Sequence, residues 1–153
     1  MRAYRSILPS VIATFLILTN QIAFAGDVQL KQYSNGGIYE GEFLNGKQHG
    51  NGKYISADGY EYSGQWVNGI IEGEGTAKYS DGSIYTGSFK ESKPNGIGKL
   101  VFLNGGSYEG TWENGNFHGK GTIIYSNGDN YTGNFKNTNL LMPLITTYSK
   151  NMS

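Results

Sequence analysis

The chain contains no cysteine, and neither sign of charge is in excess: 12 Lys and Arg balance 12 Asp and Glu over 153 residues. Without cysteine there are no disulfides, no thiolate nucleophiles and no thiolate metal ligands. Without a basic stripe, nucleic-acid binding is excluded, as is adhesion to anionic lipid by charge alone. The fold must therefore be held by hydrogen-bond ladders and packing.

Long apolar runs are also scarce, and the main one, at residues 7–18, follows Arg2 and Arg5 and precedes the small-residue site at 23–25. This order predicts a helical signal peptide at residues 1–25 that is cleaved on export, so we expect a secreted or periplasmic protein. Cleavage removes two of 12 basic residues and leaves 10 − 12 = −2. A retained membrane anchor is the alternative, although a spanning helix needs roughly 20 apolar residues.

Glycine and aromatic residues are abundant and strictly periodic. The phrase Tyr-x-Gly-x-(Phe/Trp) recurs every 23 residues, and each copy begins with a tyrosine, counted below as position 0: Tyr39, Tyr62, Tyr85, Tyr108 and Tyr131. A period of this length indicates stacked supersecondary units. We therefore look for function on an extended surface.

Asn-Gly or Asp-Gly pairs punctuate most of the repeats, as at Asn45-Gly46 and Asp58-Gly59. Both residue types tolerate positive φ, which tight hairpins require. Each repeat is thus predicted to form two antiparallel strands. Together with a lone strand at residues 27–33, this gives an all-β fold: an elongated, single-layer antiparallel sheet of 11 strands in stacked hairpins.

Side chains alternate between the two faces of a strand, so positions 0, +2 and +4 (Tyr, Gly, Phe/Trp) share one face and polar residues take the other. The second strand carries glycine at +11 and +13, as at Gly50 and Gly52. The same alternation places both glycines on the aromatic face. Because glycine weakens a strand unless something approaches its backbone, we expect the rings to lie across glycines of adjacent strands.

The repeats fill residues 26–148, and a short tail follows at 149–153. Full units begin at positions 39, 62, 85 and 108, and the unit from 131 is degenerate because Met142 and Leu144 stand where glycine stood before. Terminal units of repeat arrays are atypical because they close the core and blunt the edge strand. We expect this unit to be a cap.

The spacing of tyrosine, glycine and the later aromatic closely resembles the MORN (membrane occupation and recognition nexus) repeat. Ser92 and Thr138 depart from it at the glycine of position +7, and Ser56 at the aromatic of +17. These departures concern local turn geometry. The resemblance implies a sheet of successive hairpins used as a scaffold, dimerisation surface or attachment module, with some members linked to membranes and phospholipids.

No catalytic, metal or cofactor site is predicted. His49 and His118 both stand at +10, three repeats apart, which puts them roughly 29 Å from each other and too far apart to share a metal ion. Glu40/Glu42 and Glu72/Glu74 are close in sequence, but each pair belongs to one strand or strand entrance, whereas glycosidase carboxylates face each other across a cleft. We expect a protein that is not an enzyme.

The aromatic stripe is the remaining feature with chemical potential, and it comprises Tyr39, Phe43, Tyr62, Trp66, Tyr85, Phe89, Tyr108 and Trp112. These rings are either the core or an open trough that stacks on a ligand. The first hypothesis is an exported scaffold that presents the trough or a sheet edge to a protein partner, with a homodimer through the edge left open. The alternative is a peripheral binder of phospholipid or cell-surface glycan.

Overall fold

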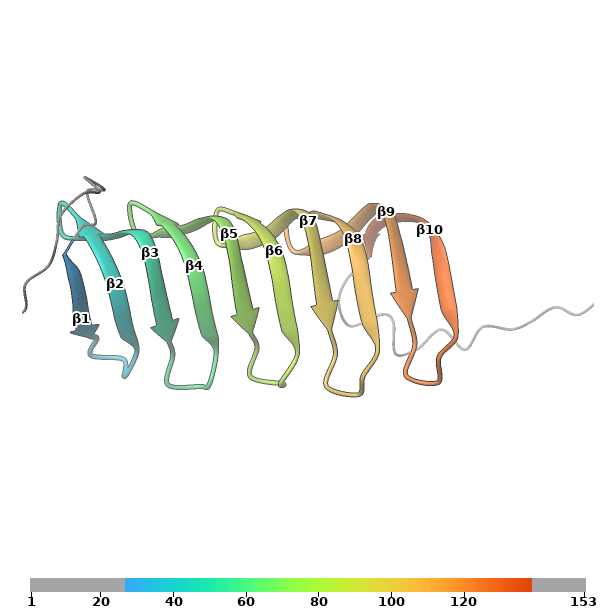
Figure 1. The fold of residues 1–153 in the computed structure, drawn as a ribbon, viewed down its shortest axis with the longest axis horizontal. Helices are drawn as coiled ribbons and strands as arrows, with labels where there is room; N and C mark the ends of the chain where they lie inside the picture. Colours follow the sequence, from blue (N-terminus) through green and yellow to red (C-terminus); the bar gives the residue numbers. More distant parts are fainter. Residues whose placement is uncertain (1–26, 139–153) are drawn as a thin grey trace, which may run out of the picture.

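The computed structural model describes residues 27–138, and all regular structure in that range is β (Figure 1). The ten strands are β1 (Val28–Gln32), β2 (Ile38–Leu44), β3 (Lys47–Ile55), β4 (Glu61–Val67), β5 (Ile70–Lys78), β6 (Ile84–Lys90), β7 (Lys93–Val101), β8 (Ser107–Glu113), β9 (Asn116–Ile124) and β10 (Asn130–Thr138). The prediction of an all-β antiparallel sheet is confirmed. The signal helix, the eleventh strand and the tail lie outside the described residues.

Each strand pairs only with its neighbours in the chain, and the order in the sheet is β1 to β10. Every pairing is antiparallel, so every connection is a hairpin. Figure 1 shows the strands side by side along the long axis of the molecule, with their axes closely aligned. Within residues 27–138 the result is an elongated, open sheet that begins with β1 and ends with β10.

One of the two sets of turns adopts the left-handed backbone at both dipeptide residues, as predicted, whereas in the other set only the glycine does, as at Gly59 with φ +89°. Three asparagines of the first set have φ near 50° and are followed by glycine: Asn45, Asn68 and Asn114. The third repeat keeps the turn without glycine, since Glu91 and Ser92 have φ of 50° and 62°. Ser92 Oγ accepts a hydrogen bond of 3.2 Å from the Ile71 amide. That side-chain bond helps to offset the left-handed strain.

The register shifts near position +3 between the two strands of one repeat, that is in the β2–β3, β4–β5, β6–β7 and β8–β9 pairs, as between Gly41 and Phe43. Gly50, at position +11, has φ +60°, and a Cβ there would meet the carboxylate of Glu42 on the polar face. The prediction that this glycine lies on the aromatic face is therefore wrong. A β-bulge breaks the alternation that the prediction assumed.

A second set of hydrogen bonds joins successive hairpin tips beyond the bulges. Gly69 N donates to Gln48 O at 2.8 Å, and the next two tips repeat this bond through Ser92 N to Ile71 O and Gly115 N to Pro94 O, each 2.9 Å. Each repeat is thereby tied to the next at both ends of its strands.

Glycines form a straight row across the sheet, one on each strand from β2 to β10: Gly41, Gly52, Gly64, Gly75, Gly87, Gly98, Gly110, Gly121 and Gly133. The next row, on the same face, holds the position 0 tyrosines and their cross-strand partners, including Ala77, Leu100 and Ile123. This face carries the core.

Candidate functional site

The predicted aromatic stripe lies in the core. Seven of its eight rings are at most 6% exposed: Tyr39, Tyr62, Trp66, Tyr85, Phe89, Tyr108 and Trp112. Phe43, the first position +4 ring, is only partly buried because no full repeat precedes it. In the same way Tyr131 in the last described repeat is 47% exposed, whereas the four earlier position 0 tyrosines are fully buried.

Each buried tyrosine ring lies over the glycine row, as predicted. A Cβ added to Gly98 would sit 2.5 Å from two ring carbons of Tyr85, and Gly75 stands in a similar relation to Tyr62. Real side chains do not approach this closely, so only glycine leaves room for the ring. The glycines therefore form the seat on which the aromatic core rests.

The tyrosine hydroxyls are used by the backbone. Tyr85 donates to Ser88 O at 2.8 Å, and the position 0 tyrosines of the other three complete repeats donate in the same way to the carbonyl three residues on, at 2.8–3.0 Å: Tyr39, Tyr62 and Tyr108. Each bond anchors the ring at the bulge. These hydroxyls are structural donors and are not free to hold a ligand.

The rings also contact one another in an unbroken chain along the sheet. Tyr85 meets Phe89 of its own repeat at 5.0 Å and Trp112 of the next at 4.9 Å, both edge to face. The same pair of contacts recurs at 5.1–5.4 Å from Tyr39, Tyr62 and Tyr108. Such geometry stabilises each pair beyond its buried area by about 0.5–1.5 kcal/mol.

The two tryptophans add hydrogen bonds across the repeat boundary. Trp112 Nε1 donates to Gly98 O at 3.0 Å, and Trp66 Nε1 donates to Gly52 O at 3.2 Å. Among residues 27–138, no buried side-chain nitrogen or oxygen is left without a partner. The fully buried polar groups of the inner face are therefore satisfied within the chain.

Burial also sets the ionisation of these rings. Desolvation raises the pKa of Tyr39, Tyr62 and Tyr108 to about 12, and the Glu42 carboxylate adds to the effect at Tyr39. The pKa of Tyr85 is raised further, again chiefly by burial. The phenols thus stay neutral, as hydrogen-bonded core groups do.

The polar residues considered for catalysis hold the hairpins together. Glu42 Oε1 accepts from Asn51 N at 2.9 Å, and Glu72 Oε2 accepts from Glu91 N at 3.0 Å. His118 Nδ1 lies 3.2 Å from Glu113 Oε2 and 3.1 Å from Asn137 Oδ1.

The other histidine is also placed at a repeat junction, where the Asn68 amide donates to His49 Nδ1 at 3.4 Å. Within residues 27–138, no three His, Cys, Asp or Glu side chains gather closely enough to hold a metal ion. That range also contains no helix of the length and hydropathy needed to span a membrane.

The outer face carries aliphatic residues that the sequence reasoning missed. One cross-strand row holds Ile38, Ile55, Ile84 and Val101, which are 37–42% exposed, and two charged residues, Glu61 and Lys78. Four of these six positions are apolar, on the face predicted to be polar. The signal was available in Ile38 and Ile84, each directly before a position 0 tyrosine, and in their strand partners Ile55 and Val101.

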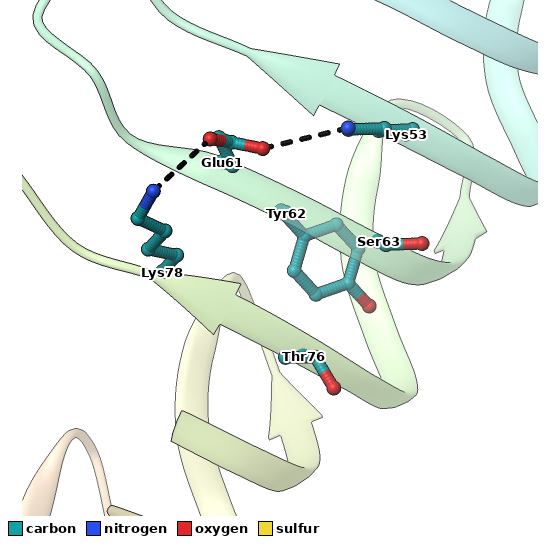
Figure 2. A pocket seen from close by; sticks show the side chains of 6 residues that line it. All are labelled: Lys53, Glu61, Tyr62, Ser63, Thr76 and Lys78. Atoms are coloured by element: carbon teal, nitrogen blue, oxygen red, sulfur yellow. Dashed lines mark ion pairs between the residues drawn. The ribbon is translucent and has the colours of Figure 1, made fainter. Parts of the chain in front are cut away.

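Glu61 lies at the centre of this row and pairs with two lysines. Its carboxylate oxygens are 3.4 Å from Lys53 Nζ and 3.6 Å from Lys78 Nζ. Figure 2 shows this arrangement beside the small side chains of Ser63 and Thr76, around a shallow hollow of about 200 Å³. The outer face is thus charged, uneven and open to solvent.

Comparison with known proteins agrees with the repeat phase. The MORN repeat family model matches residues 39–59, 62–84, 85–107 and 108–130. Its matches begin at the tyrosines taken above as position 0. Among solved structures, a similar chain is the SAS-4 (dCPAP) TCP domain of Drosophila melanogaster, solved in complex with a proline-rich motif of Ana2 (dSTIL). It is 12% identical, has a TM-score of 0.38, and the match covers 70% of this chain and 71% of that one.

Proposed function

This chain belongs to the MORN-repeat family, and from that premise we propose that it is an exported, non-enzymatic scaffold that binds a protein partner along an open edge of its sheet. MORN repeats indicate a repeat-based interaction module. Repeat arrays bind through extended surfaces because each unit contacts only its neighbours and no central pocket forms. Export is inferred from the signal-like residues 1–25.

One observation supports binding at an edge above all: the aromatic side of the sheet is filled by its own rings. Tyr39, Tyr62, Tyr85 and Tyr108 are 0% exposed and their hydroxyls bond to the backbone. A trough that is already packed cannot receive a second chain. The edges and the outer face are left for a partner.

The edge formed by β1 suits an added strand. All five residues of β1 are exposed, Val28 at 66% and Leu30 at 71%, and in the described part of the chain β1 pairs only with β2. No strand among residues 27–138 pairs with its other side. An extended peptide can add there as a further strand, with main-chain hydrogen bonds for affinity and side chains for specificity.

The non-enzymatic part of the proposal is supported by the positions of the carboxylates. Glu42 and Glu72 accept backbone hydrogen bonds at repeat junctions, and Glu61 is held by two lysines. Each carboxylate has a structural partner on its own or the next strand. Such an arrangement does not resemble two carboxylates that face each other across a cleft.

A photo-cross-linking residue at Leu30 tests the proposal, with the same residue at Leu103 as control, because both are strongly exposed at 71% and 79% and only Leu30 is on the edge. We expect a discrete protein adduct in the exported compartment from position 30 and none from 103. Equal labelling from both positions would contradict edge binding. So would absence of adducts together with sedimentation on vesicles or glycan.

The alternative, a peripheral binder of phospholipid or glycan that uses the rings, would require Trp66 and Trp112 to leave the core. They are 6% and 1% exposed, and both indole nitrogens donate to backbone carbonyls. If the rings are a ligand surface, replacing both tryptophans with alanine should abolish vesicle or glycan binding and leave circular dichroism unchanged. We expect loss of the fold instead.

A further inference from the structure

Six outer-face residues on β2 to β7 form one line across the sheet, and their order is self-complementary. The line reads Ile38, Ile55, Glu61, Lys78, Ile84 and Val101, each opposite the next in the strand register. From its centre, between β4 and β5, each direction gives one charge followed by two aliphatic residues. The two central charges have opposite sign.

This order matters when two sheets face each other across a two-fold axis that runs parallel to the strands between β4 and β5. The axis exchanges the two halves of the line. Glu61 then faces Lys78 of the second copy, Ile55 faces Ile84, and Ile38 faces Val101. Both copies contribute the same patch, as a two-fold interface requires.

The next row on the same face obeys the same symmetry. It reads Glu40, Lys53, Ser63, Thr76, Thr86 and Lys99 across β2 to β7. The same axis places Glu40 opposite Lys99 of the second copy and Ser63 opposite Thr76. Neither row brings like charges together, and the small Ser63 and Thr76 border the hollow of Figure 2 close to the axis.

We propose that this outer face binds a second copy of the chain, in a face-to-face dimer centred between β4 and β5. Eight aliphatic side chains would lose water on association, namely Ile38, Ile55, Ile84 and Val101 from each copy, which are 37–42% exposed in one chain. Desolvated apolar surface supplies the affinity, and the charges fix the register. Because the strand axes are closely aligned in Figure 1, two such faces can pack against each other.

The size of the patch predicts a weak dimer. The described strands that overlap in this dimer are β1 to β8, and eight strands at about 4.8 Å by five residues at about 3.4 Å cover roughly 38 × 17 Å, or about 650 Å² of flat sheet on each copy. A standard stable interface buries about 800 Å² of accessible surface per partner. We therefore expect dissociation constants in the micromolar range or above.

This dimer uses a face of the sheet and involves no strand pairing along β1. The proposed protein partner binds at an edge, so the two proposals can fail separately. Leu30 lies opposite Glu40 on this same face, so an adduct at position 30 counts for the edge partner only when its mass differs from that of a second copy of the chain. Loss of the dimer would not remove such an adduct, and its absence would not change the dimer.

Sedimentation equilibrium of the purified protein over about 1 µM to 1 mM tests the dimer. Ile84→Asp should weaken association at least about tenfold, because it places a carboxylate inside the interface. Ile124→Asp is the matched control, since Ile124 is 46% exposed against 42% for Ile84 but lies on β9, which no described strand of the second copy faces. Circular dichroism checks that both variants fold.

Charge exchange between Glu40 and Lys99 gives a test that effects within one copy cannot imitate. The two residues lie five strands apart, roughly 24 Å, so they do not touch in a single chain. Glu40→Lys alone and Lys99→Glu alone should each be monomeric, because each homodimer contains two repelling pairs. An equimolar mixture should dimerise, because the introduced lysine of one variant then faces the introduced glutamate of the other, and the remaining native pair, Lys99 and Glu40, also meets.

Recovery of association in the mixture, with Ile124→Asp behaving as the native chain, supports the proposal. A native chain that stays monomeric throughout the concentration range would overturn it. So would a dimer that survives both single charge reversals, which would indicate pairing through an edge, or a mixture that stays monomeric.

Discussion

Replacing Gly98 with alanine places a methyl group against the buried ring of Tyr85. The added Cβ would lie 2.5 Å from two ring carbons, and the φ of Gly98 lies outside the left-handed region, so the penalty is steric. The ring has little room to retreat, because Phe89 and Trp112 hold it from both sides at 5.0 and 4.9 Å.

The expected loss follows from three effects. Overpacking a core costs about 1–3 kcal/mol. Displacing the ring weakens the 2.8 Å bond from Tyr85 Oη to Ser88 O, which contributes about 0.5–1.5 kcal/mol. Alanine recovers about 0.5–1 kcal/mol relative to glycine within a strand. Together these predict destabilisation by roughly 2 kcal/mol, within a range of about 0.5–4.

Urea unfolding followed by circular dichroism measures this loss, and a double-mutant cycle assigns it. In a Tyr85→Leu background the ring is absent, so Gly98→Ala should cost little or become mildly stabilising. Gly105→Ala is the control, because its φ of +88° is strained and nothing lies within 4 Å of the added Cβ. Its cost should be equal in both backgrounds. If Gly98→Ala costs the same with and without the ring, the glycine row does not seat the tyrosines.

Three further outcomes follow from the same contacts. Trp112→Phe should destabilise the fold by about 1–3 kcal/mol in urea, because it leaves the buried carbonyl of Gly98 without its 3.0 Å donor; an unchanged stability would show that the bond is dispensable. Glu91→Asn should stabilise the fold by up to about 1 kcal/mol, because asparagine tolerates the left-handed φ of 50° better than glutamate does. The same substitution at the exposed neighbour, Lys90→Asn, is the control. A loss of stability in Glu91→Asn would contradict this reasoning. Burial raises the pKa of Tyr39, Tyr62, Tyr79 and Tyr108 to about 12, so their contribution to stability should be constant below pH 10, the usual pKa of tyrosine, and be lost as the pH rises towards 12. The folded state keeps these phenols neutral while the unfolded chain ionises first. Titration of tyrosinate absorbance alongside circular dichroism checks this, and rings that ionise near pH 10 before unfolding would refute it.

The phase of the repeats could be predicted because two independent signals coincide. The 23-residue spacing fixes which residues are equivalent, and the Asn-Gly turns fix where each strand reverses. Together they place Tyr85 on the same face as Gly87 and Gly98 before any coordinates are known. The seating of rings on glycine followed from that placement.

Strand alternation alone does not predict the bulges, because they follow from the number of residues on each side of the turn. Gly41 stands four residues before Asn45, since 45 − 41 = 4, whereas Gly52 stands six after Gly46, since 52 − 46 = 6. Arms of unequal length cannot bring Gly41 opposite Gly52 unless extra residues bulge out. The asymmetry was legible in the sequence.

At two positions that depart from the repeat pattern, another side chain replaces the missing group. The repeat spacing could not predict which side chain does so. Ser56 lacks the ring that other repeats carry at +17, and Tyr60, four residues on, contributes a ring that lies 5.9 Å from Tyr79. Ser92 lacks the glycine of the turn and uses its hydroxyl to bind the Ile71 amide. Neither partner is specified by spacing alone.

The claim that the tyrosine rings rest on the glycine row is tested most directly by a nuclear Overhauser measurement between the ring protons of Tyr85 and the α-protons of Gly98 in the folded protein. We expect strong cross-peaks, because a Cβ on Gly98 would touch that ring. Absence of these cross-peaks, together with a Tyr85 ring that is accessible to solvent, would contradict the claim that the aromatic core rests on a row of bare backbone.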